Sequence, residues 1–165
     1  AAIPPPPAAA AAGGGTALNL PTDRKLRALV VERDPGQRLV LKAILQRIDF
    51  ACDTLATMQE GMERLGKDVY DCVWIATLAP PMTGWDAVEM VREAEKQEKL
   101  AHCKVSKRPV PVIGIVAAQD KDLPRNKEAG FSGVMVKPFN PAVIKDIVAR
   151  HCLPLPIPPS PALAP

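Results

Sequence analysis

Five short apolar stretches, rich in β-branched residues, alternate along the chain with segments in which apolar residues recur every three or four positions. Because these stretches show no polar alternation, they are typical of strands that are buried on both faces of a sheet. They occupy residues 26–32, 51–56, 71–77, 110–116 and 133–137. Each is followed by a helical segment, which predicts an α/β fold: a doubly wound, five-stranded parallel sheet with helices on both faces.

Capping residues predict where the first and last helices begin. Asp34 followed by Pro35, and Asn140 followed by Pro141, each combine an N-cap side chain with a proline at the first helical position. Apolar residues then recur on one face of each helix. In the first helix these are Leu41, Ile44, Leu45 and Ile48, and in the last they are Ile144, Ile147 and Val148, with His151 on the same face.

The three helices between them carry shorter signals. Thr57 and Glu60 form a capping-box pattern, and the helix that they start is expected to end near Gly66. Either Thr83 or Asp86 is predicted to cap the third helix. The apolar face of that helix is predicted to comprise Ala87, Met90, Val91 and Ala94. The fourth helix, in DLPRNKEAG, must be short because proline is not tolerated in a helix interior.

Composition divides the chain into a central domain and two proline-rich ends. The ends lack the apolar, β-branched and aromatic side chains whose burial would offset the conformational entropy lost on ordering. Residues 1–25 are therefore predicted to be a disordered Pro/Ala/Gly-rich linker, and residues 153–165 a disordered Pro-rich tail. Residues 26–152 form the one folded domain. Because the first residue is Ala1 and such segments flank the domain, we expect a piece of a longer protein.

Charge and cysteine usage exclude several classes of function. The 21 Lys and Arg are interspersed with 18 Asp and Glu, and aromatic residues make up only 4% of the chain, which does not resemble a nucleic-acid-binding face. No apolar run is long enough to span a membrane, so we expect no membrane contact by this domain. The four cysteines form no CxxC pair, which indicates neither a zinc site nor a redox motif. A cytoplasmic location is the resulting prediction.

Candidate functional residues follow the predicted strands, because binding sites of doubly wound sheets lie at the carboxyl ends of the strands. The first strand is followed by Glu32 and Arg33, and the third by Ala76. The fourth strand ends at Val116, and the fifth is followed by Lys137. An alanine at the centre of such a site is unusual, because a methyl group offers neither charge nor a hydrogen bond.

The order of LVVERDP, YDCVWIATLAPPMTGWD, PVIGIVAA and EAGFSGVMVKPF resembles the CheY-like receiver domain of two-component response regulators and hybrid histidine kinases. The resemblance covers roughly residues 26–152 and implies a flavodoxin-like fold. It also implies a site in which two acidic residues and an aspartate bind Mg²⁺, and in which the aspartate accepts a phosphoryl group from a histidine kinase. A Thr or Ser and a Lys then hold the phosphoryl oxygens, and an aromatic residue in the fifth strand acts as a switch.

Only two of these features carry over to this chain, namely one acid at Glu32 and the lysine at Lys137. The other positions are substituted: Arg33 stands for the second acid, Ala76 for the phosphoacceptor, Val116 for the hydroxyl residue and Val134 for the switch aromatic. The long polar segment EAEKQEKLAHCKVSKRP, before the fourth strand, resembles insertions in receivers of hybrid kinases.

These substitutions predict that the phosphoryl chemistry is lost. An alanine methyl supplies no nucleophile. Glu32, Arg33 and Lys137 together carry a formal charge of +1, where the family pattern carries −2, so Mg²⁺ binding is predicted to be lost and no cofactor is expected. We therefore expect a pseudo-receiver that is not an enzyme and acts on a protein partner or on adjacent domains of a larger signalling protein.

Two alternatives stay open at this point. Arg33 and Lys137 would bind an anion or small ligand in the vacated pocket, or a residue other than Ala76 would accept phosphate. Asp71 is the nearest acid, but it precedes the pocket by five residues, or roughly 16 Å of strand. Plainer interpretations are that Arg33 pairs with Glu32 or Asp34 and seals the metal cavity. Lys137 would likewise pair with Glu32, while Ala76 and Val116 fill the pocket.

Overall fold

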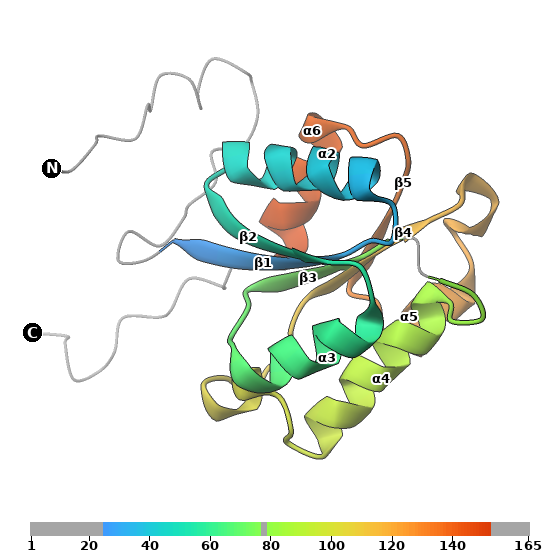
Figure 1. The fold of residues 1–165 in the computed structure, drawn as a ribbon. Coiled ribbons are helices and arrows are strands. Elements are labelled where there is room, and N and C mark those ends of the chain that lie inside the picture. The colour runs from blue at the N-terminus through green and yellow to red at the C-terminus, as the bar shows by residue number, and fades with distance from the viewer. Residues whose placement is uncertain (1–24, 77–78, 153–165) are drawn as a thin grey trace, which may run out of the picture.

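A computed structural model describes residues 25–76 and 79–152 of the chain (Figure 1). The predicted linker and tail, apart from Lys25, lie outside the described residues. Among those described, no helix combines the length and the apolar composition needed to cross a membrane.

The fold is the predicted doubly wound α/β sheet. Five parallel strands lie in the order β2-β1-β3-β4-β5. Their bounds are Leu26–Val31 for β1, Phe50–Leu55 for β2, Cys72–Ile75 for β3, Val112–Val116 for β4 and Gly133–Val136 for β5. Val31, the last residue of β1, pairs with Leu55 on one side and Ile75 on the other, so the carboxyl ends of neighbouring strands are aligned.

Helices cover both faces of the sheet, with α2 and α6 on one face and α3, α4 and α5 on the other (Figure 1). They span Pro35–Arg47 (α2), Met58–Lys67 (α3), Gly84–Lys96 (α4), Pro124–Ala129 (α5) and Pro141–Ile147 (α6). Short helical turns add Ala101–Lys104 (η1), Ala118–Asp120 (η2) and Val148–Cys152 (η3). The helix α3 therefore ends one residue beyond Gly66.

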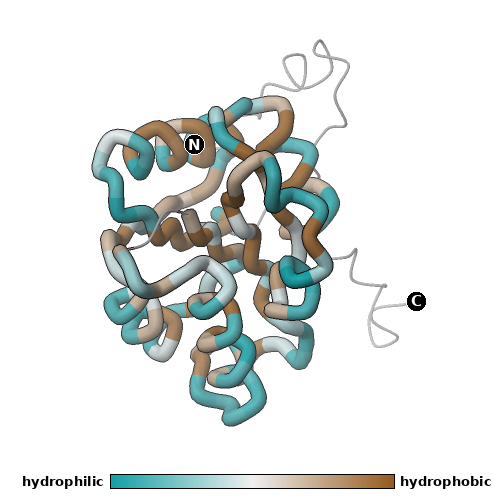
Figure 2. The backbone as a smooth tube through the Cα atoms, turned by 90° about the vertical axis from the view of Figure 1, so that its right-hand side faces the viewer, coloured by the Kyte–Doolittle hydropathy of each residue, from teal (hydrophilic) through white to brown (hydrophobic). Residues whose placement is uncertain are grey.

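Alternate residues of the central strands supply two separate cores. In β3, Cys72 and Trp74 pack beneath α2 and α6, whereas Val73 and Ile75 pack on the α3 and α4 side. Both sides of the strand are therefore buried, which is why its sequence shows no polar alternation. Figure 2 shows the hydrophobic residues gathered along the strands inside the molecule.

Side chains cap the helices where the sequence predicted. The Asp34 carboxylate accepts the Gln37 N–H at 3.0 Å, and this bond is the main reason that the pKa of Asp34 is lowered. Thr83 is the N-cap of α4, and Asp86 returns a bond to the Thr83 N–H at 3.0 Å, so both candidate residues take part in one capping box. Met90, expected on the apolar face of α4, is instead 38% exposed, and Val88 is buried in its place.

A polar network links β2 to the start of β3. The Tyr70 hydroxyl donates to Asp53 Oδ2 at 2.6 Å, and Arg27 Nη2 reaches the same oxygen at 3.1 Å. Burial alone would raise the pKa of Asp53, but the hydrogen bonds from Tyr70 and Arg27 outweigh it and lower that pKa. Burial and the bond to Asp53 raise the pKa of Tyr70 to about 12.

Titration of Tyr70 tests this network directly, because Tyr70 is the only tyrosine in the chain. We expect the tyrosinate absorbance of the folded protein to appear with a midpoint near pH 12, against about 10 in urea. The pKa of Tyr70 is higher in the folded protein than in the unfolded one, so the protonated hydroxyl contributes to the stability of the fold. This contribution is complete below pH 10 and is lost as the pH rises towards 12. Asp53→Asn should lower the folded midpoint, and a midpoint near 10 in the unaltered folded protein would contradict the network.

Candidate functional site

The fold brings the strand-end residues predicted from the sequence to one edge of the sheet. Glu32 and Ala76 directly follow the neighbouring strands β1 and β3, and the Ala76 N–H donates to the Val31 carbonyl at 2.9 Å. Val116 ends β4 and pairs with Val136 of β5, immediately before Lys137. Residues far apart in the sequence thus meet because all five strands run in the same direction.

A buried ion pair occupies the centre of this edge. Lys137 Nζ lies 3.1 Å from Glu32 Oε2, and the glutamate side chain is fully buried while the lysine is 33% exposed. The other carboxylate oxygen of Glu32 accepts the Asp34 N–H at 2.8 Å. Lys137 Nζ also lies 5.7 Å from the centre of the Phe139 ring. Glu32 and Lys137, the two charged residues that this chain retains from the family pattern, are therefore bonded to each other.

The structure does not show the predicted pairing of Arg33. Its side chain is exposed, and within the described part of the chain it forms no ion pair with Glu32 or Asp34. Glu32, directly after β1, is buried, whereas Arg33, at a bend in the chain, is exposed. Arg33 contributes only a minor share to the lowered pKa of Asp34, after the Gln37 hydrogen bond and Lys137. Arg33 therefore does not seal this edge of the sheet.

The sequence interpretation was that Ala76 and Val116 fill the pocket. In the structure they instead line a cavity of about 180 Å³. Its walls also include Gly84 and Trp85 of α4 and the ring of Phe131. At this cavity Ala76 and Val116 are apolar, whereas the family pattern has polar side chains at both positions. Val134, at the switch position, is partly buried and packs against the apolar core beneath α3 and α4.

Trp85 and Asn126 form a link at this site that sequence reasoning missed. The Trp85 indole N–H donates to Asn126 Oδ1 at 2.9 Å, and the Arg125 guanidinium lies 4.4 Å from the centre of the indole ring. Asn126 is 6% exposed, and its amide nitrogen donates to the carbonyls of Asp120 and Lys121. Trp85 thus joins α4 to α5.

The residues at this edge do not fit the Mg²⁺ that the family pattern implies. Magnesium is bound through carboxylate oxygens and water in an octahedral arrangement. The Glu32 carboxylate is held by Lys137 and the Asp34 N–H, and the side chain of Ala76 offers no oxygen. Asp71 lies at the other end of β3, where its carboxylate accepts the Arg27 N–H at 2.8 Å.

A parallel sheet in the order 2-1-3-4-5 with a lysine and an acid at the strand ends defines a flavodoxin-like domain of the kind found in signalling proteins. The family model of the response regulator receiver domain matches residues 28–149. This chain belongs to that family, and it is a receiver domain of two-component signalling.

Individual relatives are distant in sequence. The sensor histidine kinase AtsR of Burkholderia thailandensis is 26% identical over 129 residues, which cover 78% of this chain and 20% of AtsR. The chain therefore spans about a fifth of that protein. The structure of the chemotaxis response regulator CheY4 of Vibrio cholerae has a TM-score of 0.63 at 22% identity, covering 77% of this chain and 98% of CheY4.

A second similar structure contains a receiver domain together with another protein. It is the co-crystal structure of the Saccharomyces cerevisiae phosphotransfer protein Ypd1 and the receiver domain of Ssk1. The TM-score is 0.63 at 21% identity, with 75% of this chain and 87% of that chain covered. At this level of identity the two solved structures establish the shared fold.

Proposed function

We propose that this receiver domain is a pseudo-receiver, which accepts no phosphoryl group at the usual position and acts in signal transduction through protein–protein interaction. The observation that carries the proposal is Ala76, which directly follows β3 where the family pattern has its phosphoacceptor. Phosphoryl transfer requires an oxygen nucleophile, and an alanine side chain has none. The domain is accordingly proposed not to be an enzyme.

The Glu32–Lys137 ion pair supports the loss of the metal cofactor. A divalent cation would have to displace Lys137 from a fully buried carboxylate, with no second carboxylate from position 76 to compensate. We therefore propose that the domain functions without Mg²⁺. The same pair disfavours an anion-binding role, because the charge of Lys137 is balanced by Glu32.

Partners are proposed by analogy with the relatives and from the exposed surface. AtsR is a sensor histidine kinase of which a receiver-like segment is one part, and the Ssk1 receiver was crystallised with a phosphotransfer protein. In this chain Leu39 and Val40 of α2 and Val143 of α6 are exposed, by 67%, 46% and 43% respectively. Adjacent domains or a phosphotransfer-type protein in the cytoplasm would use such a surface.

Incubation with acetyl phosphate and Mg²⁺, followed by intact-mass measurement, tests the proposal. We expect no gain in mass, while a receiver domain that retains its acceptor aspartate, treated in parallel, gains one phosphoryl group. A stoichiometric gain by this chain would contradict the proposal, and peptide mapping would then identify the residue. Titration with inorganic phosphate while following the amide signals near Lys137 separates an anion sensor, which alone predicts saturable shifts.

A further inference from the structure

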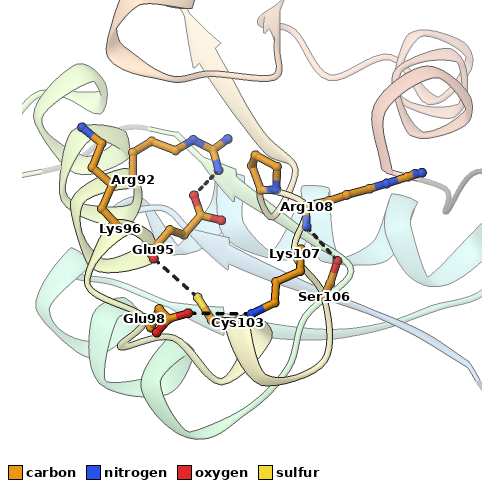
Figure 3. A pocket seen from close by; sticks show the side chains of 9 residues that line it. Arg92, Glu95, Lys96, Glu98, Cys103, Ser106, Lys107 and Arg108 are labelled. Atoms are coloured by element: carbon orange, nitrogen blue, oxygen red, sulfur yellow. Dashed lines mark hydrogen bonds and ion pairs between the residues drawn. The ribbon is translucent and has the colours of Figure 1, made fainter.

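A groove lies between the last turns of α4 and the segment 103–109 that leads into β4 (Figure 3). Its volume is about 360 Å³. The groove lies at the edge of the sheet where the strands begin, whereas Ala76 and Val116 lie where they end. The five residues of β4 separate the two edges by roughly 15 Å. A role for this groove is therefore independent of the proposed loss of phosphorylation.

One wall of the groove is formed by Arg92 and Glu95, which form an ion pair. Arg92 Nη1 donates to Glu95 Oε1 at 2.7 Å and to the Val110 carbonyl at 2.8 Å, while Glu95 Oε2 accepts the Val110 N–H at 2.7 Å. The Arg92 Nε also donates to the Gly130 carbonyl at 2.9 Å. These two side chains are only 18% and 14% exposed. They fix α4 to the segments that enter β4 and β5, and their charges cancel.

The opposite wall is held by bonds within its own segment. His102 Nε2 donates to the Arg108 carbonyl at 2.8 Å, and the Ser106 N–H donates to the His102 carbonyl at 2.9 Å. The Arg108 N–H in turn donates to Ser106 Oγ at 3.1 Å. Because the loop is already ordered, a ligand entering the groove would lose little affinity to ordering it.

The charges that remain on the rim are mainly positive. Lys96, Lys107 and Arg108 border the groove and are exposed. The one acid opposite them, Glu98, lies 3.8 Å from Lys107, but both side chains are at least 75% exposed, so this pair is weak. Residues 96–108 contain five Lys and Arg and one Glu, a net charge of +4, whereas the whole chain carries +3. The positive surplus of the protein is therefore concentrated in this segment.

We propose that this groove binds an acidic peptide segment of a partner protein, with carboxylates at Lys96, Lys107 and Arg108 and an apolar side chain against Val105. Val105 is 66% exposed in the same loop, two residues after the half-buried Cys103, which lines the groove. Single-stranded nucleic acid is disfavoured because, among the described residues, no aromatic side chain lines the groove to stack on a base. A membrane surface would need a wider apolar face than Val105 provides.

The test uses the full chain and a fluorescently labelled peptide that is rich in glutamate and has one central leucine. We expect saturable binding that weakens as salt is added. The charge-reversing variant Lys107→Glu with Arg108→Glu should weaken the binding by about tenfold or more. The matched control, Lys121→Glu with Lys127→Glu, changes the net charge equally on exposed residues outside the groove and should leave the affinity within about twofold.

Two further arms assign the ligand class. Val105→Asp should weaken binding of the leucine-containing peptide, and circular dichroism checks that every variant is folded. A single-stranded RNA homopolymer and vesicles containing phosphatidylserine are titrated in parallel, and tighter binding of either would overturn the assignment to an acidic peptide. Equal loss of affinity in the groove variant and in the control, or no loss in either, would overturn the site.

Discussion

Ala76→Asp alone will not make this domain a substrate for acetyl phosphate, whereas the triple variant Ala76→Asp, Arg33→Asp, Val116→Thr will be phosphorylated in the presence of Mg²⁺. In the single variant the new carboxylate lies beside Lys137 and Glu32, which already bond to each other. The exposed guanidinium of Arg33 adds a positive charge at the position where the family pattern has an acid. The charges of Lys137 and Arg33 offset those of the two carboxylates, so the site attracts Mg²⁺ only weakly.

The triple variant changes the formal charge of positions 32, 33, 76 and 137 from +1 to −2 and restores a hydroxyl group at position 116. The cavity of about 180 Å³ that Ala76 and Val116 line has room for the longer side chain at position 76. Phosphorylation is measured as a gain in intact mass. A triple variant with Ala76→Asn in place of Ala76→Asp is the matched control, because it keeps the size of the side chain and lacks the nucleophile.

A fourth variant isolates the role of Arg33. Ala76→Asp with Val116→Thr restores the acceptor and the hydroxyl group while the guanidinium stays in place. Because Arg33 is exposed and makes no ion pair with Glu32 in the described structure, its influence must act through charge and not through contact. Phosphorylation of this double variant as readily as the triple variant would show that the charge of Arg33 does not protect the site.

The fold was accessible from the sequence because its determinants are local. A strand buried on both faces has to be apolar throughout, and the 71–77 stretch shows this pattern around β3. Asp34, Thr57 and Asn140 each accept a backbone N–H within the first turn of their helix, so the signal and the structure lie within a few residues. Met90 was misplaced because helical spacing fixes which residues share a stripe but not how wide the buried stripe is.

Only the outline of the candidate site could be predicted from the sequence. That Glu32, Ala76, Val116 and Lys137 gather at one edge follows from the parallel order of the strands. Whether Arg33 points inward depends on the backbone path after β1, which residue types do not specify. The Trp85–Asn126 bond joins residues 41 apart, and no spacing rule links a tryptophan in one helix to an asparagine in another.

Lys137→Met is expected to lower the free energy of unfolding by about 2 kcal/mol, because it removes the cation bonded to the fully buried carboxylate of Glu32. Breaking a fully buried pair typically costs about 3–5 kcal/mol, and the smaller figure here reflects the 33% exposure of the lysine. Methionine retains the length of the side chain, so lost packing contributes little. Urea denaturation measures the change, and Lys121→Met, on an exposed lysine, should stay within about 0.5 kcal/mol of the unaltered protein.

The double variant Glu32→Gln with Lys137→Met separates the charge from the contacts. In the unaltered protein, Glu32 Oε1 accepts the Asp34 N–H at 2.8 Å. The amide oxygen of the glutamine can still accept this bond, but the buried negative charge is gone. We expect the double variant to recover most of the stability lost in Lys137→Met, because an ion pair at a buried site is replaced by neutral groups at little net cost. If the double variant is as unstable as Lys137→Met, the cost arises from lost contacts of the lysine stem. The attraction between the charges of Glu32 and Lys137 would then not be what stabilises this edge of the sheet.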